Sequence, residues 1–194
     1  MHVIVRSAAL LILFSIAAPA LAHPGHAASG VLDGLLHPLT GIDHLLAIVA
    51  VGWWSAASKA RRWWVVPLVF AVSMLGGALL GLGHGTLPYQ EWLIAASVVA
   101  LGALMLTQAR WPVAAMAALA GALALAHGYA HGSELPQGNA APWLAGMVVA
   151  TLTLHLGGAY AGQLSNRHAR WATPAAGSLT LVAGLALLAG AIGA

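Results

Sequence analysis

Long apolar segments separated by short polar breaks make up most of the chain. A membrane-spanning helix needs roughly 17–25 mainly apolar residues. Six segments after the N-terminal region have that length, near residues 35–55, 64–83, 92–108, 112–131, 142–164 and 174–193. The eight tryptophans lie at the predicted helix ends, the headgroup level that amphipathic rings prefer. The pattern predicts an all-α membrane protein built as a bundle of six transmembrane helices.

The N-terminal apolar segment is shorter than the others and has different flanks. Arg6 precedes it, and the small-residue sequence Ala20-Leu21-Ala22 follows Pro19 at its end. A charged start, a short apolar stretch and a small-residue site are typical of a secretory signal peptide. The alternative is an uncleaved first helix. The predicted organisation is a cleaved signal peptide over residues 1–22 and a six-helix transmembrane domain over residues 23–194.

Positive charge is confined to alternate breaks between the predicted spans. Every Lys and Arg after the signal segment falls on one side of the bundle, namely Lys59, Arg61, Arg62, Arg110, Arg167 and Arg170. Cytoplasmic loops of membrane proteins carry an excess of Lys and Arg. We therefore predict a multi-pass protein of the bacterial inner membrane whose mature N- and C-termini are both periplasmic, which agrees with an export signal.

The composition excludes several classes of protein. The chain is 61% hydrophobic and 6% charged, whereas a soluble domain has about 25% charged residues. Most of its surface is therefore expected to face the lipid bilayer. The basic residues form no stripe of the kind that binds nucleic acid, so no nucleic-acid partner is expected. The chain contains no cysteine, which excludes disulfides and thiolate metal sites.

Ionisable residues nevertheless occur inside the first predicted span, although such groups are costly in the hydrocarbon core. His37 and His44 are seven residues apart. On a continuous helix they would share nearly one face, about 10 Å apart along the axis. Asp43 is adjacent to His44 and could either bind a metal or orient the imidazole.

The fourth predicted span holds a second polar group. His127, His131 and Glu134 recur at i, i+4 and i+7, which is one stripe on a helix. Two imidazoles at i and i+4 can both reach one metal ion. Glu91 opens the third span on the side predicted to be periplasmic. Three further histidines are candidates for additional metal ligands: His23 at the predicted mature N-terminus, His84 at the end of the second span, and His155 midway along the fifth.

These residues predict a polar pocket that holds a metal ion and is reached from the periplasm. Imidazole and carboxylate without thiolate suit divalent nickel, cobalt, zinc or copper. The residue types alone leave the metal open.

Two runs of residues carry a family resemblance. They are His37-Pro38-x-x-Gly41-x-Asp43-His44 in the first span and His127-Gly128-Tyr129-Ala130-His131-Gly132-x-Glu134 in the fourth. The first resembles the signature of the HupE/UreJ family, and the second is similar to that family's second motif. The resemblance covers essentially the whole chain. By position it implies functional roles for His37, Asp43, His44, Glu91, His131 and Glu134, with His127 as a companion and Phe70 at an aromatic position.

The resemblance also implies a function. Members of the family are accessory membrane proteins of hydrogenase and urease systems, taken to be permeases for nickel and in some cases cobalt. We accordingly expect a permease, and not an enzyme, that imports a divalent cation through a His/Asp/Glu site. The expected partners are the metal ion, the bilayer and the hydrogenase or urease maturation proteins. Whether the chain forms a homo-oligomer stays open.

Two other functions stay open on the residues alone. One is an intramembrane metal-dependent hydrolase, in which a metal activates water. The other is a membrane subunit that senses metal or binds haem through paired histidines.

Overall fold

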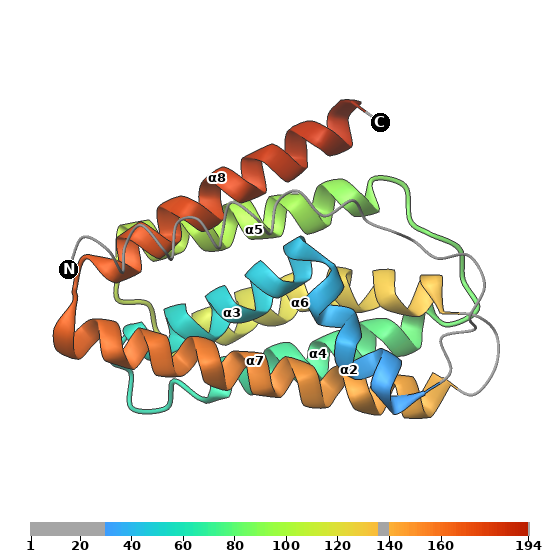
Figure 1. The fold of residues 1–194 in the computed structure, drawn as a ribbon, viewed down its shortest axis with the longest axis horizontal. Coiled ribbons are helices and arrows are strands. Elements are labelled where there is room, and N and C mark those ends of the chain that lie inside the picture. The colour runs from blue at the N-terminus through green and yellow to red at the C-terminus, as the bar shows by residue number, and fades with distance from the viewer. Residues whose placement is uncertain (1–29, 136–139, 194) are drawn as a thin grey trace.

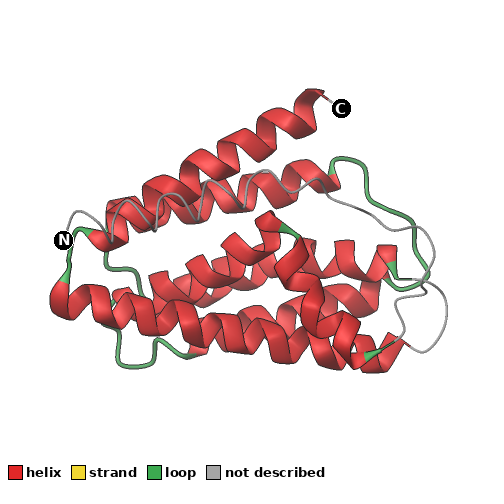
Figure 2. Ribbon diagram, in the orientation of Figure 1, coloured by secondary structure: helices red, strands yellow, loops and turns green. Residues whose placement is uncertain are grey.

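The computed structural model describes residues 30–135 and 140–193 (Figure 1). The predicted signal peptide and His23 lie outside the described residues. Within them all regular structure is helical (Figure 2). The helices are α2 (Val31–Thr40), α3 (Ile42–Ala57), α4 (Val65–Gly81), α5 (Gln90–Thr107), α6 (Val113–Glu134), α7 (Ala140–His168) and α8 (Ala172–Gly193).

Several of these helices could cross a membrane. By length and hydropathy, α5, α6, α7 and α8 each qualify as a span. The pair α2 and α3 qualifies when taken together, and α4 is an apolar helix of 17 residues. The described residues are thus all-helical and compatible with a multi-pass membrane protein. The count of six spans stays a prediction.

The first predicted span is not one continuous helix. The chain bends by 87° between α2 and α3, and Gly41 at the bend has an extended backbone. Pro38, inside α2, lacks the N–H that would continue the helical ladder. The Asp43 carboxylate then accepts a hydrogen bond of 2.7 Å from the backbone N–H of His44, one of the donors that a helix start leaves free. The expectation that His37 and His44 share one face of a straight helix was therefore wrong.

Close backbone contact joins α4 to α6. A Cβ atom added to Gly128 would collide with the carbonyl oxygen of Met74, and one added to Gly132 would collide with that of Ala78. Small residues of this kind let membrane helices approach closely, so that van der Waals contact holds them together.

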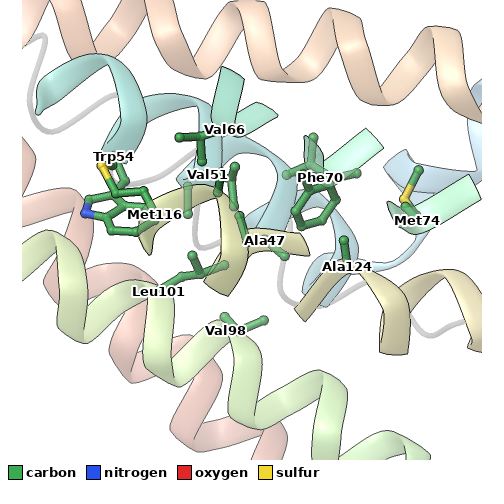
Figure 3. Close-up of a cluster of buried hydrophobic side chains, with 14 of the residues drawn as sticks. Ala47, Val51, Trp54, Val66, Phe70, Met74, Val98, Leu101, Met116 and Ala124 are labelled. Atoms are coloured by element: carbon green, nitrogen blue, oxygen red, sulfur yellow. The ribbon is translucent and has the colours of Figure 1, made fainter. Parts of the chain in front are cut away.

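The remaining helices pack around this pair. The side chains in Figure 3 form a buried apolar core that includes Val51 from α3, Phe70 and Met74 from α4, and Met116 from α6. Helices α5 and α8 lie along one another beside this core (Figure 1). The indole Nε1–H of Trp92 on α5 donates to the carbonyl oxygen of Ala191 on α8 at 3.1 Å.

The two ends of the bundle carry charged residues of opposite sign. The connections α3–α4, α5–α6 and α7–α8 meet at one end (Figure 1), where Lys59, Arg110 and Arg170 line a pocket of about 150 Å³. We call this the cationic end. At the other end Glu91 and Glu134 line a pocket of about 350 Å³, and we call it the carboxylate end.

Substituting Gly128 by Ala tests the contact between α4 and α6, because the added Cβ has no room against the Met74 carbonyl. We expect a loss of about 1–3 kcal/mol of stability, the usual cost of overpacking, seen as a lower midpoint of thermal unfolding in detergent. Gly76→Ala in α4 is the matched control, since a Cβ there meets no atom of the described residues within 4 Å. Equal unfolding midpoints for the two variants would contradict the close contact.

Candidate metal site

Four imidazoles from three helices meet near the carboxylate end. We call His37 of α2, His44 of α3, and His127 and His131 of α6 the imidazole cluster. The ring centroid of His44 lies 4.3 Å from that of His131 and 4.8 Å from that of His127. The His37 centroid lies 4.6 Å from that of His131. His127 and His131 are each 1% exposed, so the cluster reaches into the protein interior.

The bend at Gly41 is what assembles the cluster. His37 lies in the last turn of α2 and His44 in the first turn of α3, so the change of direction between them brings both rings close to His131 on α6. Their centroids are 6.2 Å apart. A straight helix would separate the two residues by about 10 Å along its axis. On α6 the spacing of four residues places His127 and His131 one turn apart on the same buried face.

Hydrogen bonds fix the orientation of each ring. The Nδ1–H of His44 donates to the Asp43 carboxylate at 2.8 Å. His37 Nε2 and His131 Nδ1 share a hydrogen bond of 2.8 Å. The Ser97 hydroxyl donates to the Ile94 carbonyl at 2.7 Å, so it accepts the 2.6 Å bond from the Nε2–H of His127.

These bonds leave ring nitrogens available for a ligand. Within the described residues, the Nε2 atoms of His44 and His131 are buried and have no hydrogen-bond partner. Because the Nδ1 atom of His44 carries the proton that Asp43 accepts, its Nε2 presents a lone pair. A backbone or carboxylate partner of this kind is what orients metal-binding histidines.

The cluster is not a preformed chelate. No group of three or more His, Asp or Glu side chains in the described part of the chain converges tightly enough to hold a metal ion as it stands. Instead, His37 and His131 hydrogen-bond to one another, His44 to Asp43 and His127 to Ser97. A metal ion that used His37 and His131 together would have to replace the hydrogen bond between them.

The two glutamates lie at the carboxylate end and outside the imidazole cluster. Glu91 in the first turn of α5 and Glu134 at the end of α6 are exposed, and both line the pocket at the carboxylate end. Glu134 follows His131 by three residues, about one turn, on α6. The pocket and the cluster are thus neighbouring parts of one polar region.

Two of the additional candidates lie in different surroundings. His84 is exposed in the α4–α5 connection, where its Nδ1–H donates to the Leu82 carbonyl at 3.0 Å. His155 is buried in α7 and lies near the Phe70 ring, whose centroid is 5.0 Å from that of His155 and 6.3 Å from that of His127.

Two residues of the site were missed by the sequence analysis. Trp143 was interpreted as a headgroup anchor, yet it is 3% exposed and its ring centroid lies 4.8 Å from that of His37. Ser97 holds His127 and was not identified. It is the single polar residue between Trp92 and Thr107, and that isolation was the available signal.

Comparison with known proteins identifies relatives over nearly the whole chain. The family model described as HupE / UreJ protein matches residues 10–187. The curated Protein HupE of Rhizobium leguminosarum bv. viciae is 40% identical over 182 residues, which cover 92% of this chain and 95% of that protein. No solved structure matches the chain.

Ser97→Ala tests the support of the cluster, because it leaves the buried Nε2–H of His127 without its acceptor. An unpaired buried donor costs about 1–3 kcal/mol, so we expect a lower midpoint of thermal unfolding. Ser178→Ala is the control, since that serine is exposed on α8 and its hydroxyl bonds only its own helix, at the Pro174 carbonyl. The assignment fails if both variants unfold at the wild-type temperature.

Proposed function

This chain belongs to the HupE/UreJ family, and we propose that it is a permease that imports a divalent transition-metal ion across the bacterial inner membrane. Nickel is the proposed substrate, and hydrogenase or urease maturation its proposed use. The observation that supports this most directly is the imidazole cluster inside an apolar bundle, where His127 and His131 are buried and His37, Asp43 and His44 are partly buried.

The cost of burying such groups argues for a function. Ionisable side chains inside membrane spans are rare and mark pathways for ions or substrates. Here one carboxylate and four imidazoles lie side by side, with two buried Nε2 atoms unpartnered within the described residues. Imidazole and carboxylate ligands favour nickel, cobalt, zinc or cupric ions over magnesium or calcium.

The two ends of the bundle give the proposed direction. The cationic end, with Lys59, Arg110 and Arg170, faces the cytoplasm by the positive-inside rule. The carboxylate end then faces the periplasm. On this orientation, α2 with α3 forms the first of six spans, residues 1–22 are removed on export, and both mature termini are periplasmic.

The proposed route follows the polar residues inward. Glu91 and Glu134 attract the cation at the carboxylate end, and His37 and His131 receive it when their hydrogen bond opens. His44 binds it through Nε2 while Asp43 holds the opposite side of the ring, and His127 completes the set. Inward movement of a divalent cation is favoured by about 4.6 kcal/mol per 100 mV of membrane potential, so the potential is a sufficient driving force.

Uptake into liposomes tests the permease. We expect the signal-cleaved protein to give saturable entry of nickel, measured against cobalt, zinc and copper. His131→Ala removes a ligand and should abolish entry. Asp43→Asn removes the carboxylate that orients His44, and it should weaken metal affinity by about 10–100-fold, the usual effect of losing a ligand's partner.

The matched control is His168→Ala, because His168 is exposed in the last turn of α7 at the cationic end. It should transport like the wild type. Entry that survives in the Asp43 and His131 variants would contradict the proposed site. Stoichiometric metal retained by the purified protein with no entry of any ion would contradict transport and favour a membrane metal enzyme or sensor.

A further inference from the structure

A fifth histidine lies deeper in the bundle than the imidazole cluster. His155 is 2% exposed, and its Nδ1–H donates to the carbonyl oxygen of Ile48 on α3 at 2.8 Å. Ile48 is one helical turn beyond His44, and a turn advances about 5.4 Å along the axis. His155 therefore sits one turn nearer to the cationic end than the ring of His44.

The hydrogen bond to Ile48 fixes the chemical form of the His155 ring. A carbonyl oxygen can only accept, so Nδ1 carries the proton and Nε2 presents a lone pair in the neutral ring. That Nε2 atom is buried and has no hydrogen-bond partner within residues 30–135 and 140–193. A histidine whose one nitrogen donates to a backbone carbonyl while the other is free has the arrangement of a metal ligand.

The side chains around His155 include two further donors to a metal. Thr151 lies one turn earlier on α7, and its hydroxyl is directed at the Met74 sulfur at 3.9 Å. Met74 and Phe70 are one turn apart on α4 (Figure 3), and the Phe70 ring packs against His155 edge to face. Met74, Phe70 and Thr151 are each no more than 1% exposed.

We propose that His155, together with the Met74 thioether and the Thr151 hydroxyl, forms a second binding position for a late divalent transition-metal ion. We call it the inner position. The inference rests on the proposed function, because the ion would reach His155 after it leaves the imidazole cluster. Phe70 packs against His155 and lies one turn from Met74 on α4, so its ring forms an apolar wall of the inner position.

The ligand chemistry of the inner position differs from that of the cluster. It contains one imidazole, one thioether and one hydroxyl, with no carboxylate among the three. Thioether sulfur is a soft donor, which favours late transition metals over magnesium, calcium or manganese. A neutral and weaker set of ligands suits an ion on its way out, since conduction requires that binding also permit release.

The same residue could instead serve only to pack α3 against α7, because the backbone of His155 touches Gly52. His155→Asn separates the two roles. The Asn amide can occupy the place of Nδ1 and donate to the Ile48 carbonyl, while the Nε2 lone pair is lost. Met74→Leu is a second variant, which removes the thioether and retains an apolar side chain of similar size.

Nickel binding by the purified full chain is measured first, by equilibrium dialysis in detergent with nickel chloride as the probe. The other substitutions are introduced into the double variant His37→Ala with His131→Ala, in which the cluster is disabled; we call this double variant the background. We expect this background to retain one nickel ion per chain. Adding His155→Asn should weaken that binding at least about tenfold, since even the loss of a ligand's partner costs about 10–100-fold, and Met74→Leu should weaken it in the same direction. Adding His168→Asn, at an exposed position, should leave it unchanged.

Nickel uptake into liposomes is the second measurement. With the cluster intact, His155→Asn should lower the maximal rate while the half-saturating nickel concentration stays at the wild-type value, because capture occurs at the other position. The inner position is overturned if the cluster-disabled background binds no nickel, or if His155→Asn and Met74→Leu bind it as His168→Asn does. Binding at the inner position without nickel entry in the wild type would contradict the proposed permease alone.

Discussion

The pairing of Asp43 with His44 is the interaction on which the polar interior depends. One carboxylate oxygen accepts from both the backbone N–H and the Nδ1–H of His44, at 2.7 and 2.8 Å. The first bond satisfies the start of α3 and so supports the bend at Gly41. The second fixes the His44 ring, whose centroid lies 4.8 Å from that of His127 and 4.3 Å from that of His131. Without the bend, His37 and His44 would lie about 10 Å apart along one helix axis, whereas their ring centroids are 6.2 Å apart in the structure.

The polar interior also depends on the position of α6, which glycine residues hold against α4. Gly128 and Gly132 bring α6 against the backbone of α4, and they alternate with His127 and His131 along the same run of sequence. Helix α6 thus turns glycines, which have no side chain, toward α4, and it turns imidazoles toward His37 and His44. A site made of several imidazole rings can therefore lie in a tightly packed bundle, because the neighbouring glycines have no side chains and take up little space.

Much of this arrangement could be predicted from periodicity and composition. The ends of α4 to α8 fall within a few residues of the predicted spans, because apolar runs and polar breaks are local signals. The spacing of His127 and His131 correctly predicted two imidazoles on one buried face. The bend at Gly41 could not be found from hydropathy, since residues 35–55 are apolar on both sides of it, and Trp143 resembles the surface tryptophans in its position near a helix end. Which helices face each other is set by packing between distant segments, and so the contacts of Ser97 and Phe70 with the histidines required the structure.

The break in the chain at Gly41 also has an electrostatic consequence. A helix carries about half a positive elementary charge at its N-terminus, and the N-terminus of a straight membrane span lies in the headgroup region. Because α3 begins at Ile42, its positive pole lies beside the imidazole cluster, where it would repel any cation that approached. The Asp43 carboxylate lies at that pole and outweighs it. The aspartate therefore changes the sign of the field at the start of α3, so that a broken helix, which would suit an anion, can receive a metal ion.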